Sequence, residues 1–247
     1  MIKGLYTTEV GMSPKLVRME IIANNLANIN TTGFKRDNAF TKVLDDAAVI
    51  EEVAGNGTDQ SNTEEYTDFS EGSLKPTNNP LDIALQGRGF LVVDTPNGPR
   101  YTRNGNLQLS LDGTLVTSAG YPVQGTSGKI QFPDIQKLQA GSIGISETGE
   151  VMVDKLSLGH VRIVDFADYR TLHKDQASMF VPDLNAVLVE GPGKQTAVRQ
   201  GHLEDSNVDG MSEMIEMIEL NRSFEADQKA LQSQNATLAA TNEVGKL

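Results

Sequence analysis

The chain has 247 residues, of which 38% are hydrophobic, so it is long enough to bury a core in one large domain or two ordinary ones. Its formal net charge of -12 argues against nucleic acid or an anionic membrane as a partner, because negative charge repels phosphate surfaces. The lack of cysteine excludes disulfides and thiolate metal sites.

The first segment, residues 1–44, is predicted to contain a helix followed by an asparagine-rich motif. Four apolar residues recur there at seven-residue spacing: Leu5, Met12, Met19 and Leu26. This spacing predicts one narrow apolar seam on a helix over about 5–29, which needs a partner helix to be shielded from water. Pro14 after Ser13 is typical of a helix start, so the residues before it are expected to form a separate short helix or a kinked first turn.

The start of the chain has no apolar stretch typical of a secretory signal, because Lys3 and Gly4 interrupt it. No apolar run approaches the roughly 18 residues that span a bilayer. We therefore expect a chain that is not inserted in a membrane and is not exported through a cleaved signal peptide.

The second segment, residues 45–71, is acidic and poor in large apolar side chains. This composition is typical of a flexible linker or of a segment that becomes ordered on assembly. The second interpretation is favoured, because Tyr66 and Phe69 are available to dock.

The third segment, residues 72–201, is predicted to be rich in β-strands. Residues 81–85, 90–93, 146–153 and 160–166 have strand-like patterns. Turn signals recur at short spacing, namely Asn97-Gly98, Asn104-Gly105, Asp112-Gly113 and Thr148-Gly149. Closely spaced turns without alternating helices predict an antiparallel sheet or barrel.

The fourth segment, residues 202–247, contains a second predicted helix over about 209–241. Its seam again has seven-residue spacing: Met217, Phe224, Leu231 and Leu238. Near its start the apolar stripe broadens to include Met211, Met214, Ile215, Ile218 and Leu220, so this part could contact more than one neighbour. The predicted fold class is α+β, with an antiparallel β-rich central domain inserted between N- and C-terminal helices that pair as a coiled coil.

Spacing alone leaves the partner of the two seams open. An intramolecular helical hairpin, a homodimeric coiled coil and a larger assembly would each bury them.

No catalytic, cofactor-binding or metal-binding residue is predicted, and no cofactor. His160, His173 and His202 are scattered without a second ligand at metal-site spacing. A peptidoglycan-active enzyme would need a positioned acid and base, for which no constellation is present. A carbohydrate-binding module would need an aromatic platform, which the few aromatic residues scarcely supply.

The order of motifs along nearly the whole chain resembles bacterial flagellar rod and hook proteins. The matching stretches are residues 22–36, 81–90, 101–105, 113–116, 201–208, 213–218 and 222–225. Within this family, the modest length and residues 241–247 are most similar to the proximal rod protein, with the distal rod protein as the alternative.

The resemblance implies a non-enzymatic subunit of the flagellar basal-body rod, which crosses the periplasm. It implies export by the flagellar type III apparatus, self-association in the axial structure, and contacts with other rod and hook-basal-body subunits. The residues expected to pack the axial helices are Leu5, Met12, Met19, Leu26, Met214, Met217, Ile218, Phe224, Leu231 and Leu238.

The family motif falls on six residues: Asn24, Asn25, Asn28, Thr31, Gly33 and Phe34. Its asparagines are expected to bond to backbone or to neighbouring subunits where the axial helix ends. The alternative is a polar helix face with a C-terminal cap, and for Phe34 a local hydrophobic anchor.

Overall fold

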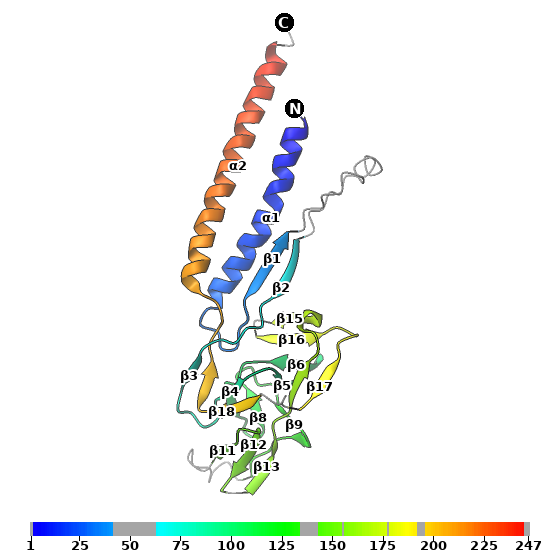
Figure 1. Ribbon diagram of the computed structural model, residues 1–247, viewed down its shortest axis with the longest axis vertical. Helices are drawn as coiled ribbons and strands as arrows, with labels where there is room; N and C mark the ends of the chain where they lie inside the picture. Colours follow the sequence, from blue (N-terminus) through cyan, green and yellow to red (C-terminus); the bar gives the residue numbers. More distant parts are fainter. Residues whose placement is uncertain are drawn as a thin grey trace. The chain divides into compact units, whose positions relative to one another are not determined.

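The computed structural model describes residues 2–41, 63–133, 143–154, 156–176, 178–191 and 196–244 (Figure 1). The chain divides into two compact units. The first contains residues 1–27, 37–66 and 209–247, and the second contains residues 28–36 and 67–208. Most of the predicted acidic segment, namely residues 45–62, lies outside the described residues, so the four-segment division stays a prediction.

The first unit contains two helices and a two-stranded sheet. The helices are α1 (Ile2–Ala27) and α2 (Gly210–Val244), and strand β1 (Asp37–Thr41) pairs with β2 (Thr63–Thr67). The two helices lie side by side and run in opposite directions (Figure 1). Accordingly, Asn25 near the end of α1 contacts Glu213 at the start of α2. Strand β2 falls inside the segment predicted as a linker.

Helix α1 differs from its prediction in two ways. It runs without a break through Pro14, so the expected separate short helix is wrong. It also ends at Ala27, before the asparagine-rich turn, where Thr31 N–H and Oγ1 donate to the carbonyl and side chain of Asn28. A turn built on Asn28 therefore ends this helix, whose end had been predicted at about residue 29.

The second unit is built on a six-stranded antiparallel sheet with the order β15-β16-β6-β5-β14-β17. Its strands are β5 (Phe90–Thr95), β6 (Gly98–Thr102), β14 (Ile163–Phe166), β15 (Leu172–Gln176), β16 (Met179–Pro182) and β17 (Leu188–Glu190). A short 3-10 helix, Tyr169–Thr171, precedes β15. The expected antiparallel β-rich domain is confirmed.

Smaller sheets complete this unit. They are formed by β3 (Leu74–Pro76) with β19 (His202–Glu204), β4 (Ile83–Gln86) with β18 (Ala197–Gln200), β7 (Leu107–Leu109) with β8 (Leu115–Thr117), β9 (Gln124–Gly125) with β10 (Gly128–Lys129), and β11 (Ile143–Ile145) with β12 (Glu150–Val153) and β13 (Leu156–His160). Three of the four turn signals lie at hairpin turns, with Gly98, Gly113 and Gly149 at positive φ.

Strand β5 is buried on both faces. Phe90 and Val92 belong to one apolar cluster, while Leu91 and Val93 belong to another. Successive side chains of a strand point to opposite faces, so the sheet lies between two apolar layers. This explains why residues 90–93 read as a continuous apolar run instead of an alternating one.

One strand prediction and one turn prediction were wrong in detail. Residues 146–149 form the turn between β11 and β12, so only the second half of the predicted strand over 146–153 is extended. Asn104-Gly105 is no hairpin turn. Gly105 precedes β7 and lies against β4, where its carbonyl accepts from Ile83 N–H. The approach is so close that a Cβ on Gly105 would lie 1.6 Å from the Ile83 carbonyl oxygen.

Candidate assembly interface

Asn25 joins three elements of the first unit. Its side-chain amide donates to the Asp37 carbonyl at 2.8 Å and to Glu213 Oε2 at 3.3 Å, and its oxygen accepts from Asp37 N–H at 3.0 Å. Asn25 is 1% exposed and Glu213 is fully buried. An amide offers both donors and an acceptor, so one side chain fixes the end of α1, the start of β1 and the first turn of α2.

The start of α2 is capped by Asp209. Its carboxylate accepts from Met211 N–H at 3.1 Å and from Ser212 Oγ at 2.6 Å. Glu213 lies in the first turn, where the positive end of the helix dipole stabilises its charge. The buried carboxylate thus has the helix N-terminus and Asn25 to offset the cost of burial.

Ion pairs lie further along the two helices. Lys15 Nζ donates to Ser223 Oγ at 2.7 Å and contacts Asp227 at 2.5 Å, and Arg18 pairs with Glu216 at 2.5 Å. The Lys15 and Asp227 side chains are 27% and 30% exposed. Partly exposed pairs of this kind each contribute little stability, so we assign them mainly to fixing the register of the helices.

Helix α2 has two apolar faces. The half-buried face contains Met217, Phe224 and Leu231, on the same side as Glu213. The other carries the outer stripe, which consists of Met211, Met214, Ile215 and Ile218. Since each residue advances a helix by about 100°, the outer stripe lies on the side of α2 facing away from α1.

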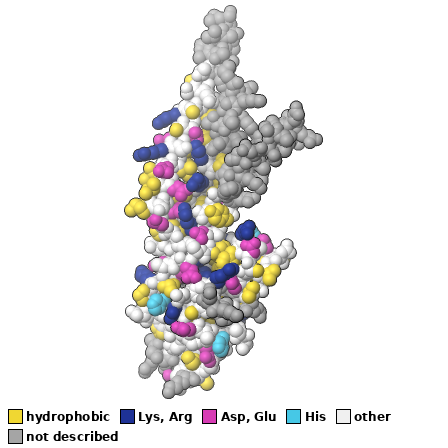
Figure 2. Space-filling view, viewed as in Figure 1, with side chains coloured by type: hydrophobic (Ala, Val, Ile, Leu, Met, Phe, Trp, Pro, Cys, Tyr) yellow, Lys and Arg dark blue, Asp and Glu magenta, His cyan; other side chains and the backbone are white. Residues whose placement is uncertain are grey.

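The outer stripe is exposed in the single chain. Its residues are between 45% and 65% exposed, and hydrophobic side chains lie among charged ones on the surface of this helix (Figure 2). Four apolar residues at helical spacing over two turns form a contiguous patch, which is typical of an interaction site.

The predicted packing residues therefore separate into groups. Met12, Met19 and Leu26 of α1 are half-buried, as are Met217, Phe224 and Leu231 of α2. Met214 and Ile218 belong instead to the outer stripe. The side chains of Leu5 and Leu238 lie outside the described residues.

The second half of the family motif belongs to the second unit. Gly33 has φ 68°, a conformation that glycine adopts at little cost, and a Cβ there would lie 2.5 Å from the Arg103 carbonyl carbon. Phe34 is fully buried, with Lys174 Nζ 3.9 Å from its ring centroid. Asn24, by contrast, is exposed on α1.

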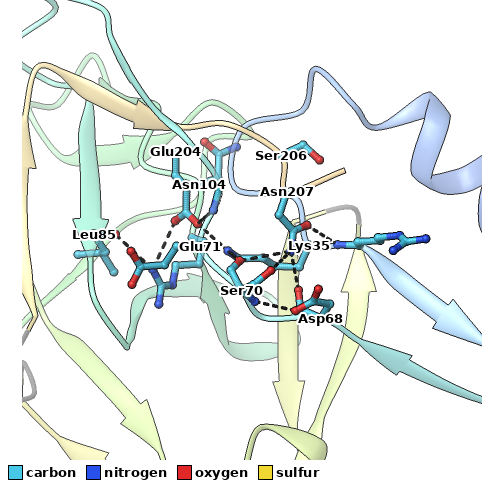
Figure 3. Close-up of polar contacts among 12 residues, drawn as sticks. Lys35, Asp68, Ser70, Glu71, Leu85, Asn104, Glu204, Ser206 and Asn207 are labelled. Carbon is cyan, nitrogen blue, oxygen red and sulfur yellow. Dashed lines mark hydrogen bonds and ion pairs between the residues drawn. The ribbon is translucent and has the colours of Figure 1, made fainter. Parts of the chain in front are cut away.

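A buried ionic network follows directly after the motif (Figure 3). Lys35 Nζ lies 2.5 Å from Glu204 Oε1 and donates to the Ser70 carbonyl at 2.6 Å. Arg103 Nη1 contacts the other Glu204 oxygen at 3.4 Å. The Lys35 and Glu204 side chains are 1% and 0% exposed. Burial lowers the pKa of the Lys35 ammonium, and the Glu204 carboxylate opposes that shift.

Glu204 also holds the backbone of two segments. Its carbonyl accepts from Gly33 N–H at 2.8 Å, and its carboxylate accepts from Gly72 N–H at 3.0 Å. Asn207, three residues on, accepts from Arg36 N–H and donates to the Asp68 carbonyl (Figure 3). These hydrogen bonds therefore hold three segments of the second unit together: residues 33–36, 68–72 and 204–207.

Sequence reasoning missed this network and the partner of Asn25. Lys35 and Glu204 are 169 residues apart, and Asn25 and Glu213 are 188 apart. Neither pair leaves a local spacing signal. The one available clue was an acidic residue in the first turn of the second helix, which marks Glu213 as a helix-start residue but does not identify its partner.

The histidines have ordinary surroundings. His173 Nε2 lies 2.8 Å from Asp183, and His202 Nδ1 lies 2.9 Å from the Gln200 carbonyl oxygen. Within the described ranges, no cluster of three or more histidine and carboxylate side chains could hold a metal ion. In the same part of the chain, neither helix carries an apolar stretch long enough to cross a membrane.

Three family models match separate parts of the chain. Residues 5–35 match the "Flagella basal body rod protein" model, residues 84–153 the "Flagellar hook protein FlgE/F/G D1 domain", and residues 199–244 the "Flagellar basal body rod FlgEFG protein C-terminal" model. The first covers α1 from residue 5 onward and the last covers all of α2, the two helices that form the candidate interface.

Full-length relatives agree with these matches. The chain is 31% identical to the flagellar basal-body rod protein FlgG of Bacillus subtilis, in an alignment that covers 96% of this chain and 97% of the relative. It is 31% identical to FlgG of Borreliella burgdorferi, with 98% of both chains covered. It is 30% identical to FlgF of Caulobacter vibrioides, with 96% and 97% covered. The chain therefore belongs to the family of flagellar basal-body rod proteins, as a structural and non-enzymatic subunit of the rod.

Proposed function

We propose that the chain polymerises into the rod through its two terminal helices, which pair as an antiparallel coiled coil and present a further apolar face to neighbouring subunits. Subunits of this family assemble with other flagellar axial proteins in the basal-body rod. The proposed packing residues are those of the two seams and the outer stripe: Leu5, Met12, Met19, Leu26, Met211, Met214, Ile215, Met217, Ile218, Phe224, Leu231 and Leu238.

The exposed outer stripe carries this proposal. The half-buried face of α2 already has α1 as its neighbour, through the Lys15 and Arg18 contacts and the buried Asn25–Glu213 pair. The outer stripe faces away from α1, so α1 leaves it exposed and a neighbouring subunit can cover it. Fully burying one aliphatic side chain stabilises an assembly by about 1.5–3 kcal/mol, so two turns of exposed apolar residues are a substantial source of association energy.

The proposed role of the motif is to fix the ends of the segment that joins α1 to the strands. Asn25 holds the helix end, Asn28 and Thr31 form the turn, and Gly33 and Phe34 anchor the chain in the second unit. Helices that are placed reproducibly repeat the same contact from one copy to the next. Heterologous contacts of this kind do not close, so they allow growth along an axis.

We propose a proximal position in the rod, with the distal position as the alternative. The basis is the modest length of the chain and the similarity of residues 241–247 to the proximal rod protein. The FlgG and FlgF relatives are similar to the same degree, at 31% and 30% identity. We further propose export by the flagellar type III apparatus without a cleaved signal peptide, and neighbours among other rod and hook-basal-body subunits.

Replacing Ile218 with aspartate is expected to abolish swimming while leaving the isolated chain as stable as the parent. Ile218 is 53% exposed in the single chain, so the charge is solvated there, whereas in the rod it would be buried without a partner. Soft-agar motility of cells that carry Ile218→Asp as their sole copy provides the measurement.

The matched control is Gln228→Asp, which adds the same charge at an exposed position of α2 outside the outer stripe. The amount of each variant recovered outside the cytoplasm separates export from assembly. Normal swimming with Ile218→Asp would contradict the proposal.

A further inference from the structure

The six-stranded sheet ends in two edges of opposite character. Strand β15 at one edge is blocked by charge and by irregular pairing. Lys174 donates to the Lys35 carbonyl at 2.7 Å, Asp175 pairs with Arg100 at 2.7 Å, and the register shifts between Lys174 and Gln176. Charged side chains and bulges are the features that keep a further strand from pairing with an edge.

Strand β17 at the other edge is less protected: its one charged residue, Glu190, is its last, and its pairing with β14 shows no shift in register. Val187, Leu188 and Val189 are 65%, 41% and 46% exposed, and Leu184 just before them is fully exposed. Residues 184–189 contain no charged side chain. An exposed apolar edge strand is a template for pairing with another chain, and natural proteins generally avoid one unless it is used.

The hydrogen bonds of β17 show which backbone groups are directed outward. Ala167 N–H donates to the Val187 carbonyl, Gly191 N–H donates to the Ile163 carbonyl, and Val189 lies opposite Asp165. Antiparallel ladders alternate between bonded and non-bonded pairs, so Val189 bonds to β14. The N–H and C=O of Leu188 therefore point away from β14, in position to accept an added strand.

Side chains on both faces of β17 extend this surface. Leu188 lies opposite Phe166, which belongs to one apolar layer, and Val189 lies on the face that carries Ile163, which belongs to the other. An added strand would continue both layers past the present edge. The surface thus fits an extended segment that places apolar side chains on both faces.

We propose that β17 accepts an extended segment of a second copy of this chain as an added strand within the rod. The proposal rests on the proposed polymerisation. A strand of three residues buries far less than the roughly 1,000 Å² of a stable interface, so this edge cannot hold a free partner. It gains strength only where another contact already holds the partner close, and neighbouring copies in a polymer meet this condition at every repeat.

The test uses the absence of cysteine from the parent chain. Leu188→Cys and the control Leu111→Cys are introduced singly, and their maleimide labelling is compared between the isolated chain and purified basal bodies. Leu111 is a fully exposed residue of the β7–β8 turn. Loss of labelling at Leu188→Cys in basal bodies, with Leu111→Cys still labelled, is the expected result. Equal labelling of the two variants in basal bodies would overturn the proposal.

The occupant is identified by a photoreactive residue at Val189 in assembled rods. A product of twice the 26.7 kDa chain mass supports a second copy, and a product containing a different flagellar protein overturns that choice. If the parent chain is absent from purified basal bodies, the proposed polymerisation is wrong. If it is present and Leu188→Cys is still labelled there, only the proposed β17 contact is wrong.

Discussion

Glu204→Ala is expected to lower the free energy of unfolding by about 3–5 kcal/mol, because it leaves two buried cations without their carboxylate. Lys35 is 1% and Arg103 3% exposed, and both contact Glu204. The same substitution removes the acceptor of Gly72 N–H. Urea unfolding of the isolated chain measures the loss as a lower midpoint.

The control for this prediction is Glu147→Ala. Glu147 also pairs with an arginine, Arg199 at 2.9 Å, but its side chain is 70% exposed. Exposed pairs contribute about 0–1 kcal/mol, so this variant should remain close to the parent. Similar losses in the two variants would show that burial of the Lys35–Glu204 pair is not what makes it important.

Gly33→Ala is expected to lower the free energy of unfolding by about 2–5 kcal/mol. A left-handed conformation costs a residue with a Cβ roughly 1–2 kcal/mol, and forcing atoms into a packed site adds about 1–3 kcal/mol. The added Cβ would meet backbone atoms of Arg103 and Asn104 at 2.5 Å. Arg103 cannot move away freely, because its side chain is bound to the Gly87 carbonyl at 2.7 Å and to Glu204.

The matched control is Gly120→Ala. Gly120 has a similar φ of 84°, but a Cβ there would meet nothing within 4 Å. It should therefore show the conformational cost alone, about 1–2 kcal/mol. Urea midpoints of both variants give the difference, and equal losses would mean that the close approach to Arg103 has no energetic role.

The parts of the fold that could be predicted are those with a local signal. The two terminal helices follow from the seven-residue spacing, and the turns at Gly98, Gly113 and Gly149 follow from their dipeptides. Strand β5 follows from its apolar run. The prediction that a helix starts at Pro14 was wrong, because tertiary contacts on α1, such as those of Lys15 with α2, override a local helix-start signal.

The parts that could not be predicted depend on residues distant in sequence. Asn25 was identified through the family motif, but its bonds to Asp37 and Glu213 require the folded first unit. Lys35 and Glu204 are charged residues that the sequence alone places on the surface, because burial of a charge depends on a partner. The predicted set of axial packing residues also grouped Ile218 with Phe224, although the two residues lie on different faces of α2.

The most direct test of assembly through the terminal helices is the accessibility of the outer stripe before and after rod formation. A single Ile218→Cys substitution in the cysteine-free chain reports this with a maleimide probe. The proposed assembly predicts rapid labelling of the isolated chain, where Ile218 is 53% exposed, and loss of labelling in purified basal bodies that contain the variant. Equally rapid labelling in both would contradict it, because the outer stripe would then remain in water in the finished rod.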